Sequence, residues 1–258
     1  MSTQRIDFLG LPLDVGVTAE KVCDMLRQKG AMRMVAYLNP SSWSIAGSEP
    51  EYLAALKQMS LIRTEGEGVS RICKWVTGME CPYTIFDISS LAGPFFKTAI
   101  AGQVSIMLLG GEPGVADQAE EKLLAAYPQL KITGVQHAYG EFAEKIDAVM
   151  AQLPDAVIVD LGSPRQELFL IALRDAGYKG MAITCDDFFT QYVREGTDYY
   201  PKWVNSRKKR FVYSLSDPQR MGSFIVDYAV LIGAALKAAA GKLRSKASGP
   251  RREDKASP

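Results

Sequence analysis

The chain has 258 residues, of which 47% are hydrophobic and 23% are charged. This composition excludes a chain that is disordered throughout, and it suffices for one large core or for one core with an appendage. The 30 basic and 29 acidic residues give a net charge of +1, which argues against a protein that binds nucleic acid through its overall charge. Basic residues concentrate from Lys202 onward, so we expect an anionic partner to meet the C-terminal end.

Short β-rich runs alternate with longer amphipathic runs, which is typical of an α/β sheet with crossover helices. The expected strands are residues 5–9, 33–38, 60–63, 104–109, 131–135, 156–161 and 181–184. The expected helices run from Thr18 to Lys29, from 115 to 126, and from Pro164 to about Ala176. We therefore predict a core over residues 1–198, a basic and apolar appendage over 199–241, and a disordered tail over 242–258.

The chain offers few soft metal ligands. It has one histidine, His137, and four cysteines, which are Cys23, Cys73, Cys81 and Cys185. These form no Cys-x-x-Cys pair, so a structural zinc site is not expected, and the thiols are predicted to be reduced and mostly buried. No Gly-x-Ser-x-Gly motif accompanies His137, which predicts a structural or peripheral role for it.

Polar and glycine-rich pieces follow several of the expected strands. These are Asn39-Pro40, Glu65 to Gly68, Gly110-Gly111 and Gly162-Ser163-Pro164. Because ligands of open α/β sheets bind at the carboxyl ends of the strands, we expect these pieces to converge on one cleft. Gly110 and Gly111 lie between a strand and a helix, where backbone N–H groups favour a phosphate, although packing alone explains many such turns.

The polar pieces also have purely structural interpretations. Ser163 and Gln166 fit a helix capping box with Pro164 as the first helical residue, and Asn39 fits a cap before a helix. Alternatively, an amide at a strand end can hold a sugar hydroxyl.

The acidic pieces leave two interpretations each. Glu65 and Glu67 fit an acidic turn, or a carboxylate that glycine neighbours leave open to a ligand and that acts as a general base. Asp186 and Asp187 fit a metal ligand set for a nucleotide sugar, or a cap at a strand end.

The segment from residue 201 to 244 mixes cations with aromatic side chains and then becomes largely apolar. Nine uncharged residues separate Asp227 from Lys237, far fewer than the roughly 20 that cross a bilayer. A basic and aromatic stretch before an apolar helix fits an interfacial anchor on anionic lipid, and a packing helix or an oligomer contact is the alternative. Arg5 and Asp7 interrupt the first apolar run, so no signal peptide is expected and the chain should stay on the cytoplasmic side.

These pieces, in order, resemble the WecG/TagA/CpsF family of bacterial glycosyltransferases. The similarity runs over about residues 5 to 222, from Ile-Asp-Phe-Leu-Gly through Leu-Asn-Pro-Ser-Ser-Trp and Thr-Glu-Gly-Glu-Gly to Asp-Pro-Gln-Arg. Its most specific match is Gly-Ser-Pro-Arg-Gln-Glu at 162–167, which resembles the family signature Gly-x-Pro-(Lys/Arg)-Gln-Glu.

The resemblance implies an inverting, metal-independent transfer of a sugar from a UDP-sugar to a polyprenyl-diphosphate-linked saccharide. The reaction would serve exopolysaccharide, wall or surface-antigen synthesis at the cytoplasmic face of the inner membrane, with the protein bound peripherally. No cofactor besides the donor substrate is implied. The implied fold is a Rossmann-like sheet with flanking helices and a helical, basic C-terminal appendage that contributes cations to the active site.

The resemblance also carries roles to positions. Glu65 stands where the family usually has the aspartate proposed as general base, and Arg220 matches an arginine expected near the diphosphate. Glu67 is expected to be an exposed neighbour of Glu65. The residues expected to bind substrate are Asn39, Gly66, Gly68, Gly110, Gly111, Gly162, Pro164, Arg165, Gln166, Arg210 and Arg220.

Two segments depart from the family pattern. Tyr-Tyr-Pro at 199–201 stands where Arg-Ala-Pro is common, and Arg-Phe-Val-Tyr-Ser at 210–214 stands where Glu-Trp-x-x-Arg is usual. Two usual arginines are therefore missing, although the cations at 207–210 can supply their charge. The donor sugar stays open. The alternatives are a metal-dependent transferase using the acidic residues, or a degenerate relative that binds nucleotide-sugar or lipid carrier as a scaffold. A homo-oligomer is compatible with each.

Overall fold

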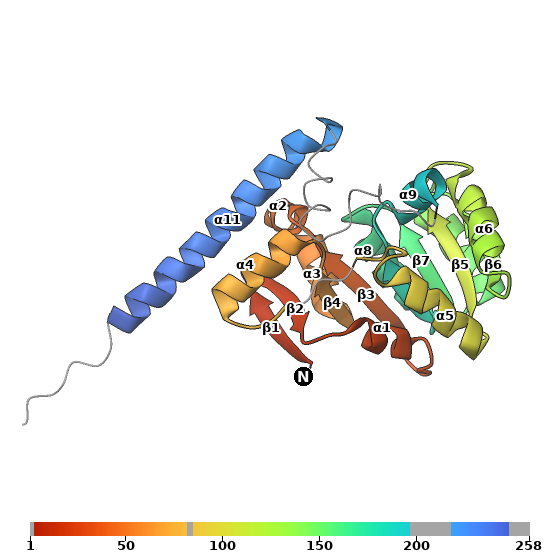
Figure 1. Ribbon diagram of the computed structural model, residues 1–258, viewed down its shortest axis with the longest axis horizontal. Helices are drawn as coiled ribbons and strands as arrows, with labels where there is room; N and C mark the ends of the chain where they lie inside the picture. Colours follow the sequence, from red (N-terminus) through yellow and green to blue (C-terminus); the bar gives the residue numbers. More distant parts are fainter. Residues whose placement is uncertain (1–2, 82–84, 197–217, 248–258) are drawn as a thin grey trace, which may run out of the picture.

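Within the described residues, 3–81, 85–196 and 218–247, the computed structural model forms an α/β fold around a parallel sheet (Figure 1). The strands are β1 (Gln4–Phe8), β2 (Leu11–Val15), β3 (Arg33–Leu38), β4 (Leu61–Thr64), β5 (Ser105–Gly110), β6 (Lys131–Gln136), β7 (Ala156–Asp160) and β8 (Met181–Thr184). Strands β3 to β8 form a six-stranded sheet in the order β4-β3-β8-β7-β5-β6, with every neighbouring pair parallel. The predicted α/β, Rossmann-like fold is confirmed.

Helices connect the strands and cover both faces of the sheet. They are α1 (Ala19–Met25), α2 (Ser41–Ser48), α3 (Pro50–Gln58), α4 (Glu67–Thr77), α5 (Ala92–Gly102), α6 (Val115–Ala126), α7 (Phe142–Gln152), α8 (Arg165–Asp175), α9 (Phe188–Glu195) and α11 (Pro218–Ala247). The expected helix over 115–126 is confirmed. The first expected helix ends earlier than Lys29, because residues 26–28 close short turns onto residues 23–25.

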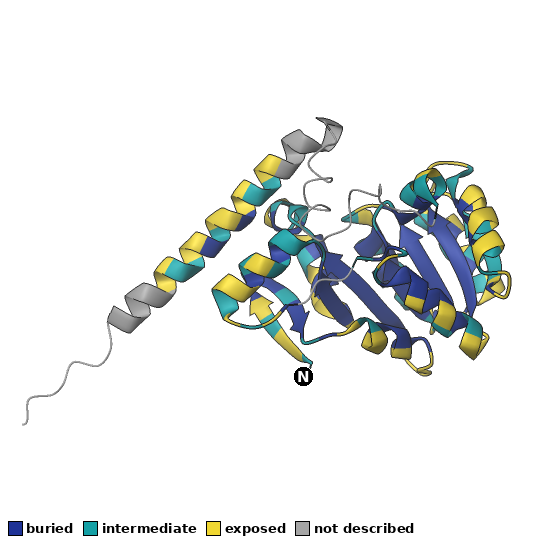
Figure 2. Cartoon of the chain, viewed as in Figure 1, coloured by how far each residue is buried: buried dark blue, intermediate teal, exposed yellow. Residues whose placement is uncertain are grey.

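The sheet separates two hydrophobic cores. Along β3, Met34, Ala36 and Leu38 point into the core that contains α2, α3 and α8, while Val35 and Tyr37 point into the core that contains α1, α5 and α9. Both faces are therefore buried, as Figure 2 shows, and this explains why the strands read as continuous apolar runs.

The first strand belongs to a separate antiparallel hairpin with β2, which the sequence did not predict. Pro12 argues against a strand, because proline has no backbone N–H to donate to a neighbouring strand. In this two-stranded sheet Pro12 lies opposite Asp7, where at most one backbone hydrogen bond is lost. Asp14 attaches the hairpin to the main sheet. Its carboxylate accepts two hydrogen bonds from Arg5, at 3.0 and 2.6 Å, and one from the Ile62 backbone N–H at 2.7 Å.

Helix α11 packs on α2 and α4 and extends beyond them (Figure 1). Leu231 and Ala235 are fully buried in this contact, and the Ser44 hydroxyl donates to Asp227 Oδ1 at 2.7 Å. The helix continues past residue 242, the predicted boundary of the appendage, as far as Ala247. The division into core, appendage and tail stays a prediction. Among the described residues, no helix combines the length and the hydropathy that a membrane crossing requires.

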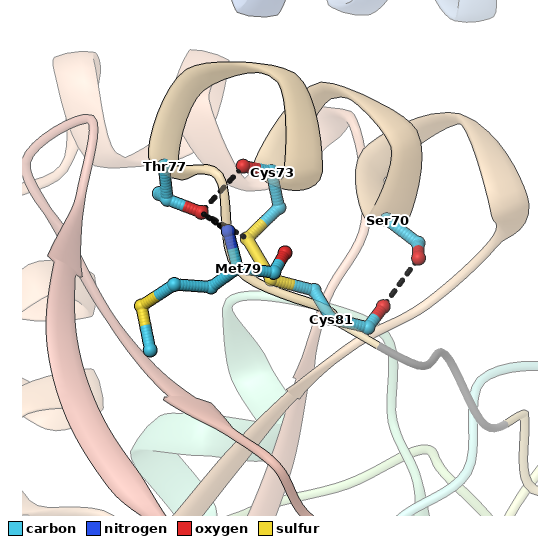
Figure 3. Close-up of a disulfide and its surroundings, with 5 residues drawn as sticks. All are labelled: Ser70, Cys73, Thr77, Met79 and Cys81. Carbon is cyan, nitrogen blue, oxygen red and sulfur yellow. Dashed lines mark hydrogen bonds between the residues drawn. A yellow bond between two sulfur atoms is a disulfide. The ribbon is translucent and has the colours of Figure 1, made fainter.

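Two of the four cysteines form a disulfide, so the prediction of reduced thiols is wrong for Cys73 and Cys81 (Figure 3). Helix α4 ends at Gly78 in a left-handed conformation, and the Met79 N–H donates to Thr77 Oγ1 at 3.1 Å. This turn reverses the chain and brings Cys81 back to Cys73, with a Cα–Cα distance of 6.3 Å. The other two cysteines, at 23 and 185, are free and buried as expected.

Candidate functional site

The carboxyl edge of the sheet collects the polar strand ends that the sequence singled out. Leu38 pairs with Thr64, and the Glu65 N–H donates to the Leu38 carbonyl at 2.8 Å, so Asn39 and Glu65 follow neighbouring strands at the same level. Strand β8 lies on the other side of β3 and leads into Asp186. The chain leaves β3 toward one core, through α2, and leaves β8 toward the other, through α9. Diverging connections of this kind open a ligand crevice in α/β sheets.

One carboxylate joins the two amides that the sequence predicted to contact substrate. Asn39 Nδ2 donates to Asp186 Oδ2 at 3.0 Å, and Gln166 Nε2 donates to Asp186 Oδ1 at 2.7 Å. The amide of Asn39 is also fixed at its oxygen, which accepts from the Ser41 hydroxyl at 2.6 Å. Thus Asp186 joins Asn39 and Gln166, which lie far apart in the sequence, and this role was not predicted for it.

A second carboxylate, that of Glu167, also accepts a hydrogen bond from Gln166. Glu167 is fully buried, and its Oε1 accepts from the Ser163 hydroxyl at 2.8 Å and from Gln166 Nε2 at 3.2 Å. Burial, together with the negative charge of Asp186, raises the pKa of Glu167 to about 7. The alternative of a capping box at Ser163 is wrong, because Pro164 is the N-cap of α8 and Ser163 bonds to these side chains.

The turn from Glu65 to Gly68 is the second part of the edge. Gly66 has a φ of 83°, and a Cβ added there would meet no atom within 4 Å, so this backbone is open to a ligand. Gly68 differs, because a Cβ there would lie 2.1 Å from the hydroxyl oxygen of Tyr228 on α11. The open side expected at Gly68 is thus filled by the protein. Burial and the charge of Glu65 raise the pKa of Tyr228 to about 12.

The neighbouring acid, Glu67, is part of helix α4. Its Oε1 lies 2.5 Å from Arg71 Nη2, one turn along the helix, and its side chain is only 18% exposed. The expectation that Glu67 is an exposed neighbour is wrong, because the ion pair holds it against the helix surface.

The remaining predicted glycines divide into packed and open positions. A Cβ at Gly110 would lie 2.1 Å from the Asp160 carbonyl oxygen, so this glycine lets β5 approach β7 closely. At Gly111, with a φ of 70°, a Cβ would touch the Val115 side chain at 3.0 Å. Gly162, with a φ of 69°, has no atom within 4 Å of an added Cβ. Of these three, Gly162 leaves room for a ligand, whereas packing explains Gly110.

The predicted cations do not reach the amide cluster within the described residues. Arg165 lies over the Phe142 ring at 6.0 Å and donates to the Ala138 carbonyl at 3.4 Å, toward α7. Arg210 and the side chain of Arg220 lie outside the part of the chain that the structure describes. His137 is exposed after β6, with its ring 6.3 Å from that of Tyr139, so the expected peripheral position is confirmed.

The acidic pair after β8 has protein partners. Both oxygens of Asp186 accept amide donors, and the Asp187 N–H donates to Asp160 Oδ1 at 3.1 Å. Between residues 3 and 247, leaving out the gaps at 82–84 and 197–217, no three His, Cys, Asp or Glu side chains are grouped as metal ligands.

Sequence reasoning missed three contributors to this edge. Asp186 was considered only as a metal ligand or a cap, Glu167 only as part of a signature, and Tyr228 not at all. Glu167 is the last residue of the signature at 162–167, which located it without predicting its contacts. Asp186 lies near the end of a predicted strand, and its contacts with Asn39 and Gln166 were not predicted. No sequence signal connects Tyr228 to the turn at Gly68, because their close approach depends on how α11 packs.

Comparison with known proteins agrees with the motifs. A sequence model described as "Glycosyl transferase WecG/TagA/CpsF family" matches residues 6–245. The chain is 27% identical over 184 residues to a UDP-Gal:alpha-D-GlcNAc-diphosphoundecaprenol beta-1,4-galactosyltransferase of Shigella boydii, covering 70% of this chain and 75% of that one. It is 24% identical over 205 residues to an N-acetylglucosaminyldiphosphoundecaprenol N-acetyl-beta-D-mannosaminyltransferase of Bacillus spizizenii, covering 76% of each. The predicted family is confirmed.

Proposed function

Because this chain belongs to the glycosyl transferase WecG/TagA/CpsF family, we propose that it moves a sugar from a UDP-sugar to a polyprenyl-diphosphate-linked saccharide, with inversion at the anomeric carbon. The product would enter exopolysaccharide, wall or surface-antigen synthesis. The names of the two relatives support the lipid-linked acceptor, and the name of the Shigella boydii enzyme supports the UDP-linked donor. Both relatives transfer hexoses, so a hexosyl donor is the first expectation.

The observation that carries this proposal is the meeting of Asn39, Gln166 and Glu65 at one edge of the sheet. Asn39 follows the strand beside Glu65, and Asp186 joins Asn39 to Gln166. This edge offers amide groups suited to sugar hydroxyls and a carboxylate suited to proton transfer. The open backbone at Gly66 lets a large acceptor approach Glu65.

The chemistry follows from these groups. Glu65 accepts the proton of the acceptor hydroxyl while that oxygen bonds to the anomeric carbon from one face. The bond from the anomeric carbon to the UDP oxygen breaks on the opposite face, which inverts the configuration. Negative charge then grows on the leaving diphosphate, and family resemblance assigns its stabilisation to Arg220, with Arg210 as a further cation. No metal ion takes part in this scheme.

The experiment measures UDP release with polyprenyl-diphosphate-linked N-acetylglucosamine as acceptor. The donors are UDP-galactose, UDP-N-acetylmannosamine and UDP-glucose, each with and without a chelator. We expect the protein to turn over one donor at the same rate with and without the chelator. The anomeric configuration of the transferred sugar in the product, determined by NMR, should be opposite to that in the donor. Turnover that the chelator abolishes would support the metal-dependent alternative. UDP-sugar binding without turnover would support the scaffold.

We also propose that α11 attaches the protein to the cytoplasmic face of an anionic membrane. Several large apolar side chains of α11 are exposed, and Trp75 on the adjacent α4 is 58% exposed. On α11 these side chains are Ile225, Val226, Val230, Ile232 and Leu236, between 41% and 62% exposed. Figure 2 shows the exposed positions along α11, and Lys237 adds a cation among them. An apolar helix face with cations suits shallow insertion among lipid headgroups.

The test of attachment is co-sedimentation with vesicles that contain phosphatidylglycerol. Replacing both Ile232 and Leu236 with aspartate should lower the bound fraction at least tenfold, because charged groups oppose burial in the interface. Leu153→Asp is the matched control, since Leu153 is 62% exposed and lies at the end of α7. Equal binding by the double variant and the control would show that attachment lies elsewhere. A homo-oligomer stays a prediction.

A further inference from the structure

The two amides of the candidate site share one acceptor. Asn39 Nδ2 and Gln166 Nε2 reach different oxygens of the Asp186 carboxylate, at 3.0 and 2.7 Å. An ionised carboxylate can accept hydrogen bonds but cannot donate them. Each amide must therefore turn its NH2 group, and not its oxygen, toward Asp186. Asp186, from a third element, is therefore the side chain that contributes to the orientation of both amides, in addition to the bonds that Ser41 makes with Asn39 and that Ser163 and Glu167 make with Gln166.

The backbone also holds Asp186 in place. Asp186 and Asp187 have positive φ values of 23° and 53°, a backbone conformation that residues other than glycine rarely adopt. The Asp187 N–H is fixed by Asp160 Oδ1 at 3.1 Å, which anchors the turn to the end of β7. Two successive left-handed residues aim the Asp186 carboxylate back between β3 and α8 rather than along the strand.

The fixed amides leave a specific atom unsatisfied. Gln166 is 1% exposed, and its Oε1 has no hydrogen-bond partner among the described residues. A buried amide oxygen without a donor costs free energy, and it is the atom that a ligand hydroxyl or N–H would satisfy. Rotating the Gln166 amide by half a turn would turn this oxygen toward the Asp186 carboxylate, which cannot donate to it when ionised, and would place an NH2 group where the oxygen now lies.

We propose that Asp186 is a positioning residue, which acts on the transferred substrate through Asn39 and Gln166 by fixing the direction of both amides. This inference rests on the proposed function, because it assigns a role within the same site. Glu167 accepts from the same Gln166 nitrogen but belongs to α8, so Asp186 is the carboxylate that also bonds to Asn39 and connects the end of β3 to α8.

The test is a mutant cycle on kcat/KM for UDP release. Asp186→Asn keeps the size and the left-handed backbone but replaces one acceptor oxygen with a donor, so one amide must turn around. We expect a loss of about tenfold to hundredfold, as for one or two hydrogen bonds to a charged group. In a variant that already carries Asn39→Ala and Gln166→Ala, the same substitution should cost less than about threefold, because its targets are gone.

Asp187→Asn is the matched control, since it makes the same change of charge on the same strained turn. It should cost less than Asp186→Asn. A merely structural role for Asp186 predicts equal losses in both backgrounds, and that additivity would overturn the inference while leaving the proposed function intact. An Asp186→Asn variant as active as wild type, beside impaired Asn39→Ala and Gln166→Ala variants, would overturn it as well.

A readout without turnover separates the inference from the proposed function. The side-chain amide resonances of Asn39 and Gln166 can be assigned by their loss in the two alanine variants. In Asp186→Asn both resonances should shift, and their exchange with solvent should accelerate. If the wild type releases no UDP from any donor, the proposed function fails; shifted resonances would then still support the orientation by Asp186, and unchanged resonances would overturn it.

Discussion

The two halves of the carboxyl edge are built in different ways. The amide cluster of Asn39, Asp186 and Gln166 consists of residues that lie just after strands or at the start of a core helix, and hydrogen bonds of 3.0 and 2.7 Å join them. The turn that carries Glu65 is covered instead by Tyr228, on a helix from the end of the chain. The strand ends of the sheet therefore determine the position of the amide cluster, whereas the surroundings of the Glu65 turn also depend on how α11 packs.

The largest effect that separates the halves is expected from Gly68→Ala. The added Cβ would lie 2.1 Å from Tyr228 Oη, so Tyr228 must move away from Glu65 or α11 must shift. Overpacking of this kind costs up to about 3 kcal/mol of unfolding free energy, measured by chemical denaturation. Gly47→Ala on α2 is the control, because an added Cβ meets nothing within 4 Å there and alanine favours a helix.

A rescue variant shows whether the clash is the cause. In Gly68→Ala with Tyr228→Ala, the new methyl group finds the space that the ring occupied. We expect this double variant to be more stable than the sum of the two single changes predicts, by at least about 1 kcal/mol. Strict additivity would show that Tyr228 does not rest on Gly68.

The disulfide is expected to have a somewhat smaller effect on the same half. It closes a loop between Cys73 and Cys81, eight positions apart, at the end of the helix that begins with Glu67. Loop-closure entropy for such a length gives about 2.5 kcal/mol. Reductant should therefore lower the Tm of the wild type and leave the Tm of Cys73→Ala unchanged. A wild-type Tm that does not respond to reductant would show that the two thiols are not joined in solution.

The smallest predicted effect belongs to the amide cluster and appears as a pH dependence. Burial and Asp186 raise the pKa of Glu167 to about 7, so the folded protein holds a proton that the unfolded chain has lost above its ordinary value of 4.5. Stability should consequently fall as pH rises from about 5 to 7.5, by about 2 kcal/mol. The Glu167→Gln variant carries a side chain that is neutral at every pH, so its unfolding free energy should not show this fall between about pH 5 and 7.5 when it is measured by chemical denaturation. The same pH dependence in the wild type and the variant would contradict the assignment.

The sequence predicts the first half of the edge better than the second. Strands β3, β5, β7 and β8 are recognisable because both of their faces are buried, and their ends locate Asn39, Gly110 and Gly162. The hairpin strand β2 was missed because Pro12 argues against a strand unless the partner register is known.

Contacts between distant segments were beyond sequence reasoning for a physical reason. The direction of the Asp186 carboxylate depends on the positive φ values of Asp186 and Asp187. The position of Tyr228 depends on the packing of α11, which buries Leu231 and Ala235. Neither leaves a periodic pattern in the residues concerned. The disulfide was not predicted either, because the spacing of Cys73 and Cys81 matches no familiar motif. The two cysteines meet because the chain turns at Gly78, at the end of α4.

The most direct test of the central claim compares Glu65→Gln with Glu67→Gln in chelator-treated enzyme. The two substitutions remove the same charge two residues apart, but only Glu65 follows β4 beside Asn39, while Glu67 is paired with Arg71. The account predicts that Glu65→Gln lowers kcat for UDP release by about a thousandfold, in the range for loss of a general base, with unchanged affinity for UDP. Glu67→Gln should retain kcat within about fivefold. Comparable rates for Glu65→Gln and the wild type would contradict the account.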